Sequence, residues 1–136
     1  MIAIVKTPIS AEQVINEVKT GGSGCVVSYV GVIRDYSRDK PVRSVEYEDA
    51  DGRAVDKLRE IAEAMEQKWP LNGVAIYHRI GMLNVGEINL VVAVAAAHRE
   101  EGFAACQYAI DRFKEELPTR KTETYQDGSV WASPCA

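Results

Sequence analysis

His98 and Arg99 carry the residue types in this sequence that are best suited to binding an anion. They follow an apolar, strand-like run (VVAVAAA, 91–97) and open a segment whose apolar spacing predicts a helix. A helix N-terminus exposes unpaired N–H groups with partial positive charge, so anions bind there. Arginine adds a planar grip on phosphate, and histidine adds a donor or a proton-transfer group near neutral pH. The alternative is a solvated helix start capped by the histidine.

Lys114 and Lys121 form a second candidate for chemistry. Lys114 lies four residues after Ile110 and three before Leu117, so it borders the apolar stripe of the same predicted helix. A lysine partly withdrawn from water has a lowered pKa and can act as a base or a nucleophile. Lys121 follows the helix-breaking Pro118, where the chain turns back, so both amines could face one pocket. The alternative is that each stem covers apolar surface while its amine stays in water.

Arg34 is the third candidate, at the point where an apolar strand (YVGVIR, 29–34) meets a polar loop. Such positions often carry function, because a rigid strand aims the residue into the rim of a site. Gly31, within that strand, could allow a close backbone approach. An ordinary surface charge is the alternative for Arg34. His78 and Arg79 end another strand and could add an anion contact, or simply form a satisfied pair.

The composition indicates one globular domain over residues 1–136, with 46% hydrophobic and 26% charged residues. The net charge of −4 argues against general nucleic-acid binding. The longest apolar run, 90–97, is too short to span a membrane, and the N-terminus does not read as a signal sequence. We therefore expect a cytoplasmic protein. Its three scattered cysteines, Cys25, Cys106 and Cys135, are expected to be free thiols, with no zinc-ligand spacing.

Hydrophobic periodicity and turn residues predict the elements that must position these side chains. Predicted strands cover 2–5, 24–33, 43–48, 73–80 and 87–96, and predicted helices cover 10–20, 54–69 and 99–117. A closing hairpin is expected over 122–132, turning at Asp127-Gly128. Two long helices and a mainly antiparallel sheet make an α+β domain.

Four details of this prediction bear on the site. The strand 24–33 is expected to be mostly buried because it is β-branched and aromatic, and 34–41 is expected to be a mobile loop. The strand 43–48 alternates, with Val45 and Tyr47 on one face. The last helix is expected to pack through one apolar stripe, made of Phe103, Cys106, Ile110, Phe113 and Leu117.

Several of these segments occur in an order that resembles one family. They are YVGVIR (29–34), VEYE (45–48), HRIGML-VGE (78–87), AHRE (97–100), FK (113–114), P-x-x-K-x-E (118–123) and DG-x-x-W (127–131). Together they resemble the large subunits of molybdopterin synthases, over nearly the whole chain from residue 23. The resemblance implies an α/β-hammerhead-like domain with an added β-rich subdomain.

The resemblance also implies a sulfurtransferase in molybdenum cofactor biosynthesis. The substrate would be cyclic pyranopterin monophosphate, and the product would be the dithiolene molybdopterin. The sulfur would arrive as a C-terminal thiocarboxylate on the Gly-Gly tail of a small ubiquitin-like partner subunit. Large subunits would pair as a central homodimer within a heterotetramer, and the step would need no metal or other cofactor.

The site residues that the resemblance implies are the candidates already singled out. Lys114 and Lys121 match the family's two active-site lysines, while Arg34, His98 and Arg99 match its substrate-binding residues. Those three side chains could hold the phosphate, and Lys114 could move protons or activate the pterin carbon. Lys121 could neutralise the phosphate or the partner's terminal carboxylate.

The sequence departs from the family pattern beside the second lysine, with Arg120 where an aromatic residue is common and Thr122 where a basic residue is common. Its tail after Trp131 is also short. Two other functions remain open on the residues alone. One is a non-catalytic α+β oligomer that binds an anionic metabolite through His98 and Arg99. The other is a module that binds a partner's C-terminal tail by adding it to a sheet edge.

Overall fold

A computed structural model describes residues 1–134 of the chain. Cys135, one of the three predicted free thiols, lies outside the described residues. The first of two sheets has the order β1-β5-β7-β2 and comprises β1 (Ile2–Val5), β5 (Leu71–Arg79), β7 (Ile88–Ala96) and β2 (Cys25–Val32). Only β1 and β5 pair in parallel there; β5 with β7 and β7 with β2 are antiparallel.

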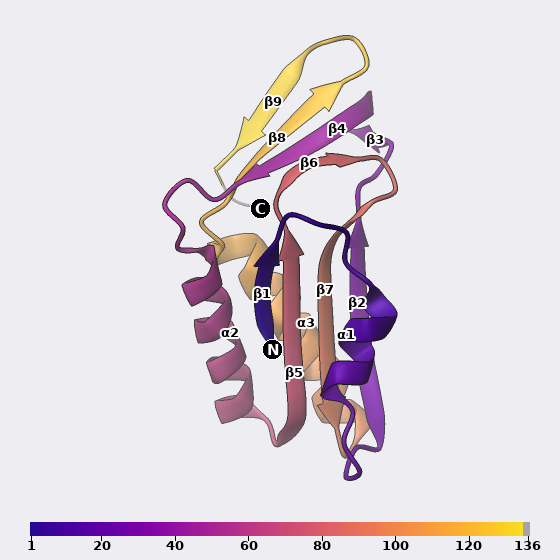
Figure 1. Ribbon diagram of the computed structural model, residues 1–136, viewed down its shortest axis with the longest axis vertical. Helices are drawn as coiled ribbons and strands as arrows, with labels where there is room; N and C mark the ends of the chain where they lie inside the picture. Colours follow the sequence, from indigo (N-terminus) through magenta and orange to yellow (C-terminus); the bar gives the residue numbers. More distant parts are fainter. Residues whose placement is uncertain (135–136) are drawn as a thin grey trace.

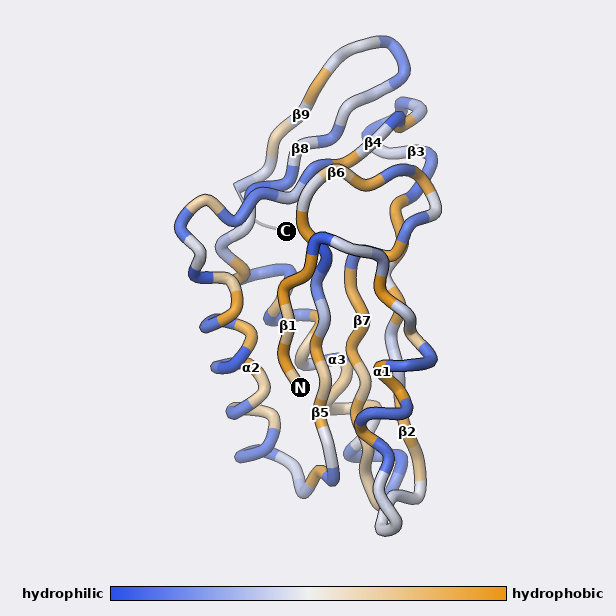
Figure 2. Tube along the Cα trace, in the orientation of Figure 1, coloured by the Kyte–Doolittle hydropathy of each residue, from blue (hydrophilic) through white to orange (hydrophobic). Residues whose placement is uncertain are grey.

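Helices cover both faces of this first sheet (Figure 1). Helix α1 (Ala11–Val18) lies on one face, and α2 (Ala54–Lys68) and α3 (Arg99–Glu116) lie on the other. Ser10 caps α1 as predicted, with its Oγ 3.2 Å from the Gln13 N–H. The core forms on the two faces of β5 and β7, and β7 is apolar along most of its length (Figure 2). Because both faces of these strands are covered, β7 and the middle of β5 (74–76) carry continuous rather than alternating apolar residues.

The second sheet lies beyond one end of the first (Figure 1). Its order is β3-β4-β8-β9, from β3 (Tyr36–Ser37), β4 (Lys40–Glu48), β8 (Arg120–Tyr125) and β9 (Val130–Ser133), and β6 (Gly81–Asn84) also pairs with β4. A small core of its own includes Val45 and Tyr47, the two residues predicted to share a face of β4. The expected α+β fold with an added β-rich subdomain is therefore confirmed, as is the closing β8–β9 hairpin.

Three predictions about local structure are wrong. The loop 34–41 instead contains β3 and the start of β4, joined through Arg38 and Asp39, which both have positive φ. Strand β2 is an edge strand, so Val30 and Val32 are 40% and 52% exposed rather than buried. Phe103 is 62% exposed and lies off the buried stripe of α3.

Gly102 explains the position of Phe103. Gly102 is buried, and a Cβ placed on it would lie 2.9 Å from Val27 Cγ2 of β2. The side of α3 that carries Gly102 therefore packs closely against the sheet, and the side chain of Phe103 points away from the core. No helix within residues 1–134 is long and apolar enough to cross a membrane.

Candidate active site

A polar pocket of about 270 Å³ lies where the second sheet meets β2, β7 and the end of α3. Its lining includes seven side chains that can hydrogen-bond or carry charge: Tyr29, Arg34, Tyr47, Asn89, Lys114, Lys121 and Glu123. The pocket thus combines three of the five residues expected from the sequence to form the site with four that had been given no role.

The last turn of α3 and the first half of β8 place the two lysines on this pocket. Phe113 is 2% exposed and anchors the end of the helix, and Lys114 follows it at the pocket edge. In β8, Lys121 pairs with Tyr47 of β4, and Glu123 pairs with Val45. Because side chains alternate along a strand, Lys121 and Glu123 face the same side of the sheet. The helix end and the strand therefore present both amines to one cavity.

Glu123 is the carboxylate of this otherwise cationic pocket and is only 4% exposed. Its Oε1 accepts hydrogen bonds from Ser37 Oγ at 3.0 Å and from Tyr125 Oη at 2.9 Å. Its Oε2 lies 4.0 Å from Lys121 Nζ. A buried carboxylate needs such partners to remain charged. Glu123 lies two residues after Lys121 in the motif P-x-x-K-x-E. In a strand, this spacing places both side chains on the same face, so it could have identified Glu123 from the sequence.

The amine of Lys121 experiences opposing influences on its pKa. Burial lowers the pKa of Lys121 below its ordinary value, the Glu123 carboxylate raises it, and the nearby charges of Lys114 and Arg34 lower it further, the net direction being down. Arg34, Lys114 and Lys121 line the same pocket, so their like charges disfavour one another. A lysine with a lowered pKa can exchange a proton more easily at neutral pH.

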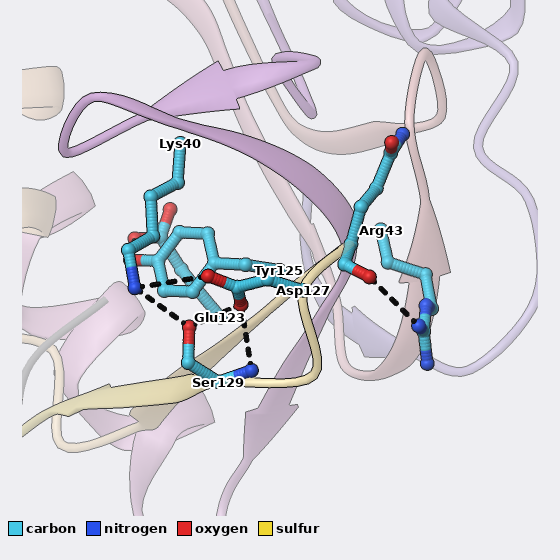
Figure 3. A network of polar contacts seen from close by, with 7 residues as sticks. Lys40, Arg43, Glu123, Tyr125, Asp127 and Ser129 are labelled. Carbon is cyan, nitrogen blue, oxygen red and sulfur yellow. Dashed lines mark hydrogen bonds and ion pairs between the residues drawn. The ribbon is translucent and has the colours of Figure 1, made fainter.

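A network of polar contacts holds the β8–β9 hairpin against β4 beside Glu123 (Figure 3). Lys40 Nζ lies 2.9 Å from Ser129 Oγ and 3.2 Å from Asp127 Oδ2. Hydrogen bonds from Ser129 and the Lys40 amine lower the pKa of Asp127 to about 2. Tyr125, which binds Glu123, lies within the same hairpin. These contacts fix the strand that carries Lys121 and Glu123.

Arg34 enters the pocket from the end of β2, at the rim position that its sequence context predicted. Gly31, in the same strand, has close neighbours, but they are side chains and not the backbone that was expected. A Cβ on Gly31 would lie 2.8 Å from Asn89 Oδ1 and 3.2 Å from Tyr29 Cε1. A larger residue there would displace the Asn89 side chain from the pocket wall.

His98 and Arg99 lie outside the pocket that contains Lys114 and Lys121. His98 is the N-cap of α3, as predicted, but its side chain makes no capping hydrogen bond. Both residues are exposed and line a separate hollow with Gly24, Cys25 and the first acidic residues of the helix. Lys114 is fifteen residues further along α3, about 22 Å at 1.5 Å per residue. One chain therefore does not bring the His98-Arg99 pair to the lysine pocket.

The remaining candidates from the sequence have structural roles. Arg79 Nη1 binds Glu87 Oε2 at 2.9 Å. His78 Nε2 and Arg79 Nε are buried and have no hydrogen-bond partner among the described residues, so the expected strand-end pair is only partly satisfied. Cys106 is buried in the core, and burial raises the pKa of its thiol to about 11. Cys25 and Cys106 are both free.

Fold and pocket together define a class: an α+β domain with a cation-lined cavity suited to a small anionic molecule. The family model described as "MoaE protein" matches residues 4–116. A relative named molybdopterin synthase catalytic subunit, from Bacillus subtilis, is 38% identical over 128 residues, covering 94% of this chain and 82% of the relative. The chain belongs to the MoaE protein family.

Solved structures agree with this assignment. The crystal structure of molybdopterin synthase from Staphylococcus aureus has a TM-score of 0.89 and 33% identity, covering 96% of this chain and 94% of that one. A complex of subunits 1 and 2 of molybdopterin-converting factor from Helicobacter pylori shares the fold, with a TM-score of 0.75 and 12% identity over 93% of this chain and 86% of that chain. Family membership makes the chain an enzyme subunit of molybdopterin synthesis.

Proposed function

We propose that this chain converts cyclic pyranopterin monophosphate to the dithiolene molybdopterin, with sulfur from the C-terminal thiocarboxylate of a small ubiquitin-like subunit. The observation that carries the proposal is the convergence of Arg34, Lys114 and Lys121 on one pocket in a chain of this family. Three cations around one small cavity suit a phosphate and the negative charge that develops during sulfur attack. Neither cysteine within residues 1–134 lines this pocket, which is consistent with sulfur arriving on a partner.

Each charged residue of the pocket has a separate role, which follows from its position and charge. Arg34 binds the phosphate with its guanidinium fork. Lys114 moves protons during sulfur attack or activates the pterin carbon. Lys121, whose pKa is lowered mainly by burial, neutralises the phosphate or the partner's terminal carboxylate. Glu123 holds Lys121 in place and limits the fall of its pKa.

His98 and Arg99 contribute to substrate binding from a second copy of the chain. The length of α3 separates them from the lysine pocket of their own chain, so a central dimer is the simplest way for both groups to reach one substrate. Two features favour such pairing. Strand β2 has a free edge with Val30 and Val32 exposed, and Phe103 is exposed on the first turns of α3.

The small subunit docks with its Gly-Gly tail directed at the lysine pocket, giving a heterotetramer around the central dimer. A complex of two subunits is the state of the Helicobacter pylori protein that shares this fold. We assign the reaction to the cytoplasm, because free thiols such as Cys25 and Cys106 persist in a reducing compartment.

Reconstitution tests this function. The purified chain is mixed with a thiocarboxylated small subunit and the cyclic pterin, and dithiolene product is followed by its conversion to a fluorescent oxidised derivative. We expect product that depends on all three components. If wild-type protein binds the pterin and the small subunit yet forms no dithiolene, the non-catalytic binding function is the better account.

A further inference from the structure

Tyr47 and Asn89 form a neutral polar pair on the wall of the cationic pocket. Tyr47 comes from β4 and is 4% exposed, and Asn89 comes from β7. Asn89 Nδ2 donates a hydrogen bond to Tyr47 Oη at 3.0 Å. The pair therefore joins the two sheets at the pocket, and neither residue carries a charge that would hold a phosphate.

His78 fixes this pair from behind. Its Nδ1 lies 2.8 Å from the backbone oxygen of Asn89, and since a carbonyl only accepts, Nδ1 carries the proton. The ring packs edge-to-face on Tyr47, with centroids 5.0 Å apart, and on Phe113 at 4.9 Å. Burial lowers the pKa of His78 to about 4, so the ring stays neutral and adds no positive charge. The wall is thus rigid and uncharged.

The pair offers a donor and an acceptor side by side. Tyr47 Oη accepts from Asn89 and, within residues 1–134, has no second partner, so its own hydrogen is free to donate. Burial raises the pKa of Tyr47 to about 12, which keeps this hydrogen in place at neutral pH. Asn89 Oδ1 has no protein donor among the described residues, and Gly31 leaves room for it at the pocket edge.

A set of cations alone attracts any small anion without fixing its orientation. A donor and an acceptor at fixed positions add that orientation, and they discriminate against ligands that leave them unpaired. With a volume of about 270 Å³, the cavity is small enough for one ligand to touch both kinds of group.

We propose that Tyr47 and Asn89 form a specificity subsite that recognises a cyclic-amide edge, an N–H beside a C=O, in a ligand whose anionic group is held by Arg34, Lys114 and Lys121. The inference rests on the proposed function, because a pterin ring presents such an edge. Tyr47 and Asn89 would orient the substrate and take no part in proton or sulfur transfer.

Two variants test the subsite without disturbing the cations. Tyr47→Phe keeps the ring and its contacts with His78 but removes the hydroxyl. Asn89→Ala removes the amide and keeps the backbone carbonyl that His78 binds. Tyr77→Phe is the matched control, because it removes a hydroxyl that binds Glu17 at 2.7 Å and lies outside the pocket. Thermal melting confirms that each variant is folded; if Tyr47→Phe does not fold, Asn89→Ala decides alone.

Calorimetric titration measures the affinity of each protein for the cyclic pterin monophosphate and for inorganic phosphate. Each pocket variant should bind the pterin about 3- to 10-fold more weakly, the range expected for one lost hydrogen bond, and phosphate as the wild type does. The control should match wild type for both ligands.

If both variants bound the pterin with wild-type affinity, the proposed subsite would be wrong, while the proposed function would still stand. An equal loss of pterin and phosphate affinity would also overturn the subsite, because the cation cluster would then be what changed. A wild-type protein that does not bind the pterin would overturn the proposed function and the subsite together.

Discussion

Lys121 Nζ lies 4.0 Å from Glu123 Oε2, in a pocket where the carboxylate is almost fully buried and the lysine is partly buried. Ser37 and Tyr125 occupy the other carboxylate oxygen, so Glu123 is held as the counter-charge of Lys121. Lys114 and Arg34 act on the same amine in the opposite direction. The protonation of Lys121 is therefore set by its neighbours within the pocket.

Glu123→Gln should lower the pKa of Lys121 further. The carboxylate raises that pKa, so its removal leaves burial and the two neighbouring cations to act alone. NMR titration of the lysine side chains would show a lower midpoint for Lys121, and phosphate affinity would be lost at a lower pH than in the wild type. Glu66→Gln, on the exposed side of α2, is the control and should leave the midpoint unchanged. An unchanged or higher midpoint in Glu123→Gln would refute the counter-charge role.

Gly31→Ala should destabilise the fold by about 1–3 kcal/mol, the usual cost of overpacking. The new methyl would stand 2.8 Å from Asn89 Oδ1 and 3.2 Å from Tyr29 Cε1, so both side chains must move. Denaturant unfolding measures the change. Gly21→Ala is the control, because nothing lies within 4 Å of its added Cβ, and it should stay within about 0.5 kcal/mol. Equal stability of the two variants would contradict the close approach at Gly31.

His78 should make the fold sensitive to acid. Its pKa is about 4 in the folded chain against an ordinary 6.5, so the unfolded state binds more protons between these values. Stability should therefore be complete above pH 6.5 and fall as the pH drops toward 4, by up to roughly 3 kcal/mol from this residue. Urea unfolding of wild type and His78→Gln across this range measures the contribution of His78.

The His78→Gln variant should be less stable at neutral pH and should lose less stability on acidification. His98→Gln removes the other histidine, which is exposed, and should retain the wild-type acid dependence. If wild type and His78→Gln lost stability in parallel as the pH falls, protonation of His78 would not be coupled to unfolding. Burial of the imidazole would then not lower its pKa, which contradicts the prediction.

Mixing two inactive variants tests whether a second copy supplies Arg99. If the substrate site is shared across a dimer, Lys114→Ala and Arg99→Ala chains complement each other, because a mixed dimer has one site with both residues intact. Random exchange would restore about one quarter of wild-type activity, since half the dimers are mixed and half their sites are whole. If Lys114 and Arg99 acted within one chain, the mixture would stay inactive.

Patterns within one element predicted much of the fold. The Ser10 cap and the shared face of Val45 and Tyr47 depend on neighbours a few residues apart, and both were correct. The exposure of β2 depends on its place at the sheet edge, which its own residues do not encode. Phe103 was misplaced because the contact of Gly102 with Val27, between a helix and a distant strand, determines which side of α3 is buried.

In the site, too, local sequence patterns predicted some features, while others depend on contacts between distant elements. A helix start was a sufficient reason to select His98 and Arg99, but their distance from the lysines follows from the length and direction of α3. Lys114 and Lys121 were singled out chiefly by resemblance, since their common pocket arises where a helix end meets β8. The roles of Tyr47 and Asn89 depend on the meeting of two sheets, which no local pattern describes.

A single-turnover assay of Lys114→Ala tests whether the pocket that holds the two lysines is the catalytic site. Wild type, Lys114→Ala and the surface control Lys6→Ala are each saturated with cyclic pterin and thiocarboxylated small subunit, and the rate of dithiolene formation is measured. We expect Lys6→Ala to match wild type and Lys114→Ala to be slower by at least ~100-fold, the lower range for loss of a proton-transfer group. Dithiolene formation by Lys114→Ala at the wild-type rate would contradict the catalytic assignment of this pocket.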